Sequence, residues 1–374
     1  MVPAYHSQVT SSRQTPLYPV HARLGAVMTS FAGWQMPLRY GSETAEHRAV
    51  RHAAGLFDLS HMGEILVSGP GAGAALDYAL TGFLSPLRPG RARYTMICAP
   101  DGGVLDDLVV YRQGEQEFLV IANAANTSVV CEELRSRASG HDAVVADATD
   151  DYALIAIQGP AAAGILGGLT DLDLGAMKYY AGAFGPVAGC LCWVARTGYT
   201  GEDGFEVFCR PADAVEVWDA LASAGAPAGL IPAGLAARDT LRLEAGMPLY
   251  GNELGPDLTP FEAGLGRVVK FDKPGDFVGR SALLARSSAG PRLELVGLTL
   301  QSRRVARHGY PVFADGKEAG TVTSGAPSPT LGQPIAMAYL NADPGVRDAV
   351  LTVGIRGEAV PAQLTDLPFY SRSR

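Results

Sequence analysis

One stretch of the chain decides how the rest is interpreted: Gly102-Gly103-Val104-Leu105-Asp106-Asp107-Leu108-Val109-Val110-Tyr111. It places two adjacent carboxylates at the point where a turn becomes an apolar strand. Because side chains alternate along a strand, at least one of Asp106 and Asp107 must face a covered side. A buried carboxylate costs free energy unless hydrogen-bond donors meet it. The stretch therefore predicts polar partners next to these aspartates.

The neighbouring segments predict what those partners are. Residues 94–98 have the composition of a strand, and the Gly, Asp and Pro residues of 100–103 favour the turn of a hairpin. In this hairpin Tyr94 lies diagonally within reach of Asp107. A second hairpin places Asn123, at the end of its returning strand, beside Asp107. The Tyr, Asp and Asn side chains are therefore expected to converge.

Two interpretations of this cluster are open at this point. Most adjacent aspartates in a sheet are satisfied by structural hydrogen bonds from their neighbours. A cluster of titratable groups is alternatively a functional site. The rest of the chain decides between the two.

Composition narrows the class of protein. A chain of 374 residues is long for one core, so two or three domains are expected. Its 45 Gly and 25 Pro predict many turns and short strands rather than long helices. The net charge is −8, and no basic run exceeds the pair Arg303-Arg304, so nucleic acid is not an expected partner.

Cysteine usage and hydropathy indicate the compartment. The five cysteines form no Cys-x-x-Cys pair and no His-Glu-x-x-His occurs, so neither a disulfide framework nor a metal site is expected. No apolar stretch reaches the roughly 18 residues of a membrane span. Residues 1–14 resemble a loose leader that lacks the composition of a transit peptide. We expect a cytoplasmic protein.

The pattern of elements predicts α+β layers rather than a doubly wound sheet. A helix is expected from the N-cap Ser42 to about Ala54, followed by hairpins, helices and strands. Five short strands are expected at the C-terminal end, as a small antiparallel barrel or Greek-key module. Their ranges are 293–300, 309–313, 318–324, 335–340 and 350–355. A domain boundary is expected between Gly275 and Pro291, in the loop-like run 287–291.

Two further segments carry candidate functional residues. In 196–208 a Gly-rich loop leads into a strand that presents Glu206 on one sheet face, but neither a dinucleotide fingerprint nor a phosphate loop is present. In 233–246 a predicted helix carries Arg238 within an apolar stripe. The structural interpretation of that arginine is an ion pair with a neighbour on the helix, Asp239 or Glu244.

Six motifs in order resemble one family, the T-proteins of the glycine cleavage system. The resemblance runs from about residue 15 to about residue 370. The motifs are Phe31-Ala32-Gly33-Trp34, Phe57-Asp58-Leu59-Ser60-His61-Met62, Gly103-Val104-Leu105-Asp106-Asp107, Gly198-Tyr199-Thr200-Gly201-Glu202-Asp203-Gly204, the run 236–246 and the run 323–332. One departure is Arg267, at a position where the family often has an aromatic residue.

The resemblance implies a fold of two mixed α/β domains with antiparallel sheets around a central folate cleft, plus a C-terminal β-barrel. The first domain would combine residues 1–62 and 148–251. The second would combine residues 63–147 and 252–285, and the barrel would span 286–374.

The resemblance also implies an activity. The enzyme would be an aminomethyltransferase that moves the methylene of an aminomethyl-lipoyl H-protein to tetrahydrofolate and releases ammonia, with no metal. Carried over by position, Asp107 would be the catalytic residue, and Asp106, on the opposite strand face, would matter far less. The implied folate-binding residues are Met62, Tyr94, Asn123, Tyr199, Glu206, Arg238 and Tyr370.

These residue types suit a folate. A carboxylate such as Glu206 can accept a fork of hydrogen bonds from the pterin edge. A guanidinium such as Arg238 matches the anionic glutamyl tail. Aromatic and thioether side chains, here Tyr94, Tyr199 and Met62, suit the flat apolar middle of the molecule.

Two other functions are alternatives to this one. Related domains occur in demethylases of dimethylglycine or sarcosine, but those are usually fused to a flavin module, and no dinucleotide fingerprint is present here. Related folate-binding accessory proteins carry Lys-Gly-Cys-Tyr-x-Gly-Gln, which this chain lacks. For docking of the lipoyl carrier, the candidates are Arg303, Arg304 and Arg307; the simpler interpretation is a solvated charged loop.

Overall fold

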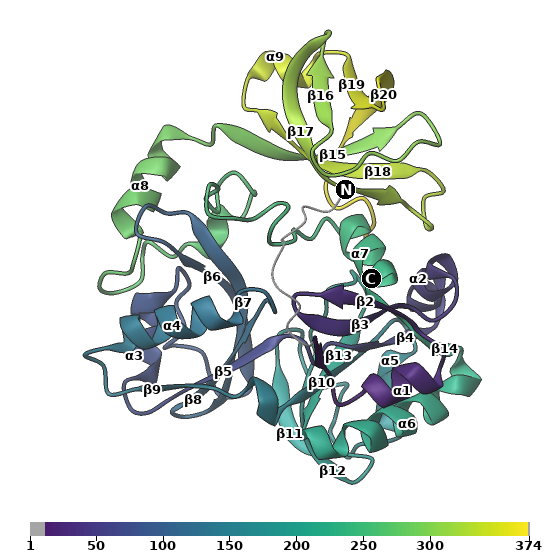
Figure 1. Ribbon diagram of the computed structural model, residues 1–374. Coiled ribbons are helices and arrows are strands. Elements are labelled where there is room, and N and C mark those ends of the chain that lie inside the picture. The colour runs from purple at the N-terminus through teal and green to yellow at the C-terminus, as the bar shows by residue number, and fades with distance from the viewer. Residues whose placement is uncertain (1–11, 373–374) are drawn as a thin grey trace.

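The computed structural model describes residues 12–372, so residues 1–11 of the expected leader lie outside the described part. Three lobes make up the molecule: a barrel at the top of Figure 1, a first sheet lobe at the lower right and a second sheet lobe on the left below the barrel. The predicted combination of α+β layers with a C-terminal barrel is confirmed. The domain boundaries given above stay a prediction.

The first lobe is built on a six-stranded sheet in the order β11-β12-β13-β10-β4-β14. Its central strand, β10, has all six side chains buried, as a sheet covered on both faces requires. Helices α1 (Tyr18–Arg23), α5 (Ala162–Gly167) and α6 (Ala214–Gly225) cover its outer face. In sheet order the strands are Gly182–Val187, Cys190–Ala195, Gly204–Cys209, Ala153–Gln158, Ala54–Asp58 and Leu230–Pro232.

The second lobe is built on a five-stranded sheet in the order β6-β7-β8-β5-β9. The predicted hairpin is present: Ile97 pairs with Asp106, and a bulge follows between Ile97 and Cys98. Helices α3 (Ala72–Ala79) and α4 (Thr127–Ala138) cover its outer face. In sheet order the strands are Arg91–Cys98, Val104–Gly114, Glu117–Ala122, Gly63–Ser68 and Val144–Asp147.

The inner faces of these two sheets pack on each other, and this interface positions the site. A buried cluster there combines Leu154 and Phe208 of the first sheet with Tyr111 and Ile121 of the second. Because side chains alternate, Glu206 on β13 and Asp107 on β7 both point to this interface rather than to the helices. The backbone joins the sheets as well, through an isolated bridge between Arg91 and Ala181.

Two more helices extend this interface toward the barrel. Helix α2 (Glu43–His52) begins at the predicted N-cap, where Ser42 Oγ accepts from the Ala45 amide at 3.4 Å. Helix α7 (Leu235–Glu244) packs Ala237 and Leu241 into the cluster between the sheets.

Smaller elements complete the sheet lobes. A three-stranded sheet has the order β1-β3-β2, with bounds Arg13–Gln14, Trp34–Arg39 and Val27–Phe31. Residues between Leu254 and Leu283 pack against β6 and β7 of the second sheet. Short 3-10 turns are η1 (Thr149–Asp151), η2 (Pro211–Asp213), η3 (Ala226–Ala228) and η4 (Gly266–Val268), and Arg267 is exposed in the last of them.

The C-terminal lobe is a closed barrel in the order β15-β18-β17-β16-β19-β20. The barrel has six strands, so the prediction of five strands is wrong: the sequence does not predict β20. Its Pro361 and its Glu and Ala residues are of types depleted in strands, although Val360 and Ala362 enter the core. In order the strands are Leu293–Leu300, Pro334–Asn341, Lys317–Pro327, Pro311–Ala314, Leu351–Ile355 and Glu358–Thr365, with the short helix α9 at Pro344–Arg347.

The expected boundary region contains helix α8 (Arg280–Ala289). Ser287 and Ser288 favour a loop by their residue type but are helical, and only Gly290, at φ 77°, ends the helix. None of the helices in residues 12–372 has the length and apolar character needed to cross a membrane.

Candidate active site

The predicted cluster around Asp107 is present. Its Oδ2 accepts from the Tyr94 hydroxyl at 3.0 Å, and its Oδ1 accepts from Asn123 Nδ2 at 2.8 Å. Burial raises the pKa of Asp107, and the bonds from Tyr94 and Asn123 oppose that rise. All three residues are half-buried, so the cluster meets both core and solvent.

The neighbouring Asp106 also accepts a hydrogen bond from the Asn123 side-chain amide. It points away from Asp107 and is fully buried, where Asn123 donates to it from its backbone N at 2.9 Å and from Nδ2 at 2.8 Å. Asn126 adds a third donor, at 2.8 Å. Burial, and then the Asp107 carboxylate, raise the pKa of Asp106 to about 7. The expectation that Asp106 matters far less for turnover stays a prediction, but the residue anchors Asn123.

Glu206 lies on the facing sheet. Its Oε2 accepts from Thr197 Oγ1 at 2.5 Å and from the Tyr111 hydroxyl at 3.0 Å. Tyr111 is fully buried and comes from β7, so this bond crosses from one sheet to the other. The sequence does not indicate Tyr111 or Thr197 as site residues, because nothing in their local sequence connects positions so far apart.

Arg238 and Tyr199 pack together. The Arg238 guanidinium lies over the Tyr199 ring at 4.8 Å from its centroid, and burial lowers the pKa of Arg238. The prediction that Arg238 forms an ion pair with Asp239 or Glu244 is wrong, because both acids pair with other arginines. Asp239 pairs with Arg242 at 2.8 Å and Glu244 pairs with Arg51 at 2.9 Å. Within residues 12–372 Arg238 has no carboxylate partner.

The carboxylates between the sheets affect the pKa values of several groups around them. Burial is the largest cause of the raised pKa of Tyr94, Tyr180 and Tyr199, and the Asp107 carboxylate adds to the rise in each. The Glu206 carboxylate acts on both Tyr180 and Arg238. Residues from both sheets and from α7 therefore lie within the range of one another's charges.

Tyr180 packs against the cluster between the sheets, and the sequence does not indicate it. It adopts φ 58°, which a tyrosine rarely does, at the seam between the sheets. Its carbonyl accepts from the Ala92 amide at 2.9 Å, and its amide donates to the Arg196 carbonyl at 3.0 Å. The Glu206 and Asp107 carboxylates both add to the rise in the pKa of Tyr180 that burial causes.

Met62 follows a buried histidine. Met62 is half-buried and packs against the cluster between the sheets. His61 is 3% exposed, and its Nδ1 has no hydrogen-bond partner among the described residues. Burial, and then the Arg238 charge, lower the pKa of His61 to about 4, so the ring is neutral at physiological pH.

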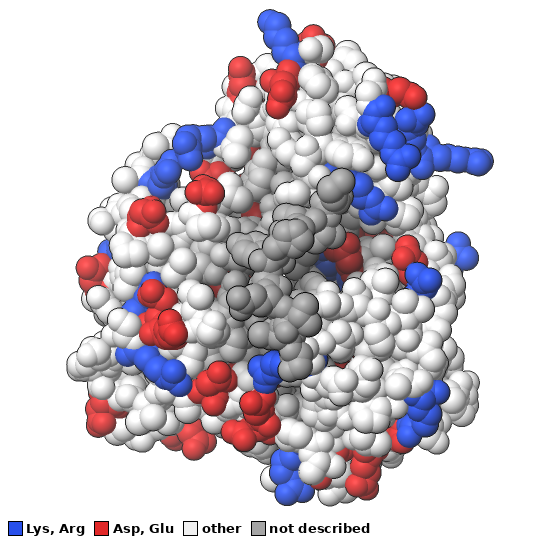
Figure 2. All heavy atoms as spheres, in the orientation of Figure 1, with Lys and Arg blue, Asp and Glu red and all other residues white. Residues whose placement is uncertain are grey.

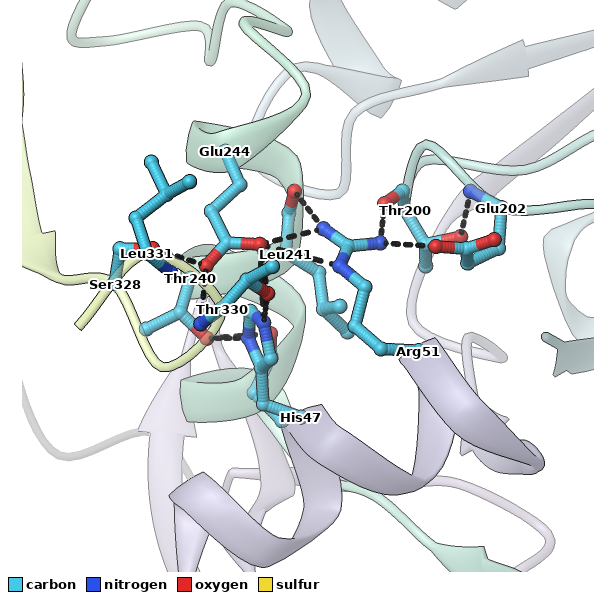
Figure 3. A network of polar contacts seen from close by, with 11 residues as sticks. His47, Arg51, Thr200, Glu202, Thr240, Leu241, Glu244, Ser328, Thr330 and Leu331 are labelled. Atoms are coloured by element: carbon cyan, nitrogen blue, oxygen red, sulfur yellow. Dashed lines mark hydrogen bonds and ion pairs between the residues drawn. The ribbon is translucent and has the colours of Figure 1, made fainter. Parts of the chain in front are cut away.

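Tyr370 belongs to a different neighbourhood. The Arg51 guanidinium lies over its ring at 4.0 Å from the centroid, and its amide donates to the Glu244 carbonyl at 2.8 Å. Both partners are members of the buried network in Figure 3, which also joins His47, Glu202 and Thr330. These contacts do not lead to Asp107, so the folate role of Tyr370 stays a prediction. Among the described residues, no group of His, Cys, Asp and Glu is arranged to hold a metal ion.

The raised pKa of Asp106 predicts a pH dependence of stability. Its folded pKa lies above the unfolded value near 4, so the folded state binds more protons between these pH values and stability falls as pH rises from about 4 to about 7. Asp106→Asn should remove this slope, which amounts to about 3 kcal/mol between pH 5 and 8. Urea unfolding of both proteins at the two pH values measures it. The exposed Asp257→Asn should keep the slope, and an unaltered slope in Asp106→Asn would refute the assignment.

Comparison with known proteins identifies the family. The family models for the GCVT N-terminal domain and the glycine cleavage T-protein C-terminal barrel domain match residues 17–273 and 294–371. An aminomethyltransferase of Saccharopolyspora erythraea is 62% identical over 98% of this chain and 100% of its own length. One of Streptomyces avermitilis is 62% identical over 97% and 98%.

A solved structure agrees with these relatives. The crystal structure of glycine cleavage system aminomethyltransferase T from Bartonella henselae matches with a TM-score of 0.90 and 36% identity, over 96% of this chain and 98% of that one. The resemblance, the fold and the transferase class inferred from the sequence are thereby confirmed, and neither alternative function is favoured. The chain belongs to the glycine cleavage T-protein family of aminomethyltransferases.

Proposed function

We propose that this enzyme transfers the methylene of an aminomethyl-lipoyl H-protein to tetrahydrofolate and releases ammonia. The observation that carries the proposal is the half-buried Asp107 carboxyl, held by Tyr94 and Asn123 and facing the groups of the opposite sheet. This is the arrangement expected of a group that must meet a reacting nitrogen without being freely hydrated.

The pterin would be held by Glu206. This carboxylate faces the interface between the sheets, and among the residues that the structure describes it receives hydrogen bonds, from Thr197 and Tyr111, on one oxygen only, Oε2. An ionised carboxylate has about four acceptor sites, so it can still accept a fork from the pterin edge. Tyr199 and Met62, both half-buried, would line the flat part of the folate.

The folate tail would be held by Arg238. Its guanidinium is stacked on Tyr199 and has no carboxylate partner in residues 12–372. A half-buried cation that makes no ion pair is costly even where a carboxylate such as Glu206 acts on it from farther away, and an anionic ligand relieves that cost. The neutral ring of His61 beside it adds no competing charge.

Asp107 would act through charge and position. In the reaction N5 of the folate would attack the methylene carbon as the C–N bond to the amine breaks. The C–S bond to the lipoyl arm would then break, the sulfur leaving as a thiol, and N10 would close onto the iminium-like carbon, so positive charge develops at N5 and at that carbon. A carboxylate fixed by Tyr94 and Asn123 needs no reorganisation to stabilise that charge. Because burial raises its pKa, Asp107 can also hold a proton for the leaving amine.

The proposed activity has a direct test. The chain is mixed with H-protein that carries the aminomethyl group, and ammonia release is followed with and without tetrahydrofolate. Folate-dependent release is expected. Ammonia released at the same rate without folate, or no release at all, would overturn the proposal.

Asp107→Asn should separate binding from turnover. The Tyr94 hydroxyl can rotate to accept from the new amide, so folate should bind nearly normally, while loss of the fixed charge lowers kcat by about a hundredfold, or ~3 kcal/mol. Single-turnover kinetics and equilibrium folate titration measure the two effects. Asp257→Asn is the matched control, and a kcat equal to that of wild type removes Asp107 from the chemistry.

Arg238→Ala should weaken folate binding about 10- to 100-fold, because a charge-assisted hydrogen bond is lost. Titration with tetrahydrofolate is compared with titration using tetrahydropteroate, which lacks the glutamyl tail. The effect should disappear with the tailless ligand and be absent in Arg48→Ala, an exposed arginine on α2. Equal losses for the two ligands would show that Arg238 does not hold the tail.

Docking of the H-protein would use a basic surface of the barrel. Basic side chains gather at one edge of this lobe in Figure 2. Arg303, Arg304 and Arg307 are all exposed, and only Arg304 has a carboxylate close by among the described residues, Glu358 at 2.7 Å. Charges at such a rim change association rates and their salt dependence.

Arg303→Glu should therefore raise the KM for H-protein several-fold at low salt and flatten its salt dependence, while the KM for folate stays constant. Steady-state rates at several ionic strengths measure this. Arg292→Glu is the control, as an exposed arginine at the start of the barrel. If the KM of Arg303→Glu for H-protein equals that of wild type at every salt concentration, these arginines form a solvated charged loop and do not take part in docking.

A further inference from the structure

Glu244, at the end of α7, is held by the barrel. A turn between β17 and β18 donates to it from Ser328 Oγ, from the Thr330 amide at 3.1 Å and from Thr330 Oγ1 at 2.7 Å. Burial would raise the pKa of Glu244, but hydrogen bonds from His47, Ser328 and Thr330 lower it to about 2. The carboxylate is therefore ionised at physiological pH, although its side chain is inaccessible to solvent.

Arg51, on α2, connects Glu244 to the loop that contains Thr200 and Glu202 (Figure 3). Its guanidinium has five N–H donors, and each has an acceptor. Two go to Glu244, from Nε at 3.1 Å and Nη2 at 2.9 Å, and one goes to the Leu241 carbonyl at 3.4 Å. The remaining two go to the Thr200 carbonyl at 2.7 Å and to Glu202 at 2.9 Å. Such a fully used fork fixes its acceptors relative to one another.

The far acceptors of Arg51 lie in the loop that presents Tyr199. Thr200 directly follows Tyr199, and Gly201 between the two acceptors has φ 82°, a conformation that side chains rarely adopt. A Cβ at Gly201 would come within 2.9 Å of the Ala245 Cβ, so the loop sits tightly on the end of α7. The turn of the barrel, Glu244, Arg51 and this loop therefore form one continuous chain of contacts.

We infer that Arg51 is a positioning residue for folate binding, through which the barrel holds the Tyr199 loop in its binding conformation. The inference rests on the proposed function for its ligand. Arg51 itself contacts the loop at the Thr200 carbonyl and the Glu202 carboxylate, and it also lies over the ring of Tyr370. Among the described residues no contact joins it to Tyr199 or Arg238, so the effect inferred here is on the position of the Tyr199 ring that Arg238 stacks on. The barrel then contributes to the folate site without supplying a side chain that touches the reacting atoms.

Neutral substitutions in the barrel turn test this link. The double variant Ser328→Ala with Thr330→Val removes two hydroxyl donors from Glu244 and leaves every loop residue unchanged. We expect about a tenfold higher Kd for tetrahydrofolate, with kcat at saturating folate within about twofold of wild type. Thr321→Ala, an exposed threonine of β17, is the matched control and should leave the Kd unchanged.

Hydrogen exchange distinguishes a local change in the loop from a change in the stability of the whole protein. Deuterium uptake by peptides covering 198–203 should become faster in the double variant, while uptake by β7 and β8 stays the same. Arg51→Lys keeps the charge but cannot make five bonds, and should give the same local change in the loop. Uptake in 198–203 equal to that of wild type in both variants, or an unchanged folate Kd in the double variant, overturns the inference.

Failure of the link and failure of the proposed function give different results. If wild-type protein neither binds tetrahydrofolate nor releases ammonia, the proposed function is wrong, and the exchange experiment alone decides whether the barrel holds the loop. If wild type is active and the double variant binds folate equally well, the proposed function stands and the link fails.

Discussion

A single amide nitrogen serves two adjacent carboxyls, and the site depends on it. Asn123 Nδ2 lies 2.8 Å from an oxygen of both Asp106 and Asp107, although these side chains point to opposite faces of β7. Each of its two hydrogens thus has an acceptor. The fully buried Asp106 fixes the amide from the helix-covered side, and the amide then fixes Asp107 on the open side. The buried Asp106 therefore holds, through Asn123, the position of Asp107, which faces the site.

This local part of the site is what the sequence predicts best. Hairpin geometry follows from turn residues and alternation, so the meeting of Tyr94, Asp107 and Asn123 can be derived from the order of the residues alone. The bond from Tyr111 to Glu206 cannot be derived in this way, since it depends on how two sheets pack. The same holds for Tyr180, whose positive φ has no sequence signal in a tyrosine.

Charged residues show where local reasoning fails. Sequence proximity favours Asp239 or Glu244 as the partner of Arg238, but helix geometry turns these acids to Arg242 and, across to α2, to Arg51. The sixth barrel strand escapes prediction for a related reason. Its residues have weak strand propensity, and only closure of the barrel gives Val360 and Ala362 a core to enter. Both outcomes are decided by partners distant in the chain.

The two groups of charged residues differ in how completely their polar atoms are paired, and this difference distinguishes a structural network from a candidate binding site. Around Glu244, every donor of Arg51 meets an acceptor, and the carboxylate is inaccessible; such a network has nothing left to offer a ligand. Around Asp107 the residues are half-buried, and within residues 12–372 Arg238 makes no ion pair and Glu206 accepts hydrogen bonds on one oxygen only. An incomplete set of polar partners is costly in a folded protein. Its persistence beside a complete set supports the proposal that a ligand completes it, and the anionic tail and amidine-like edge of the proposed folate would supply the missing charges and donors.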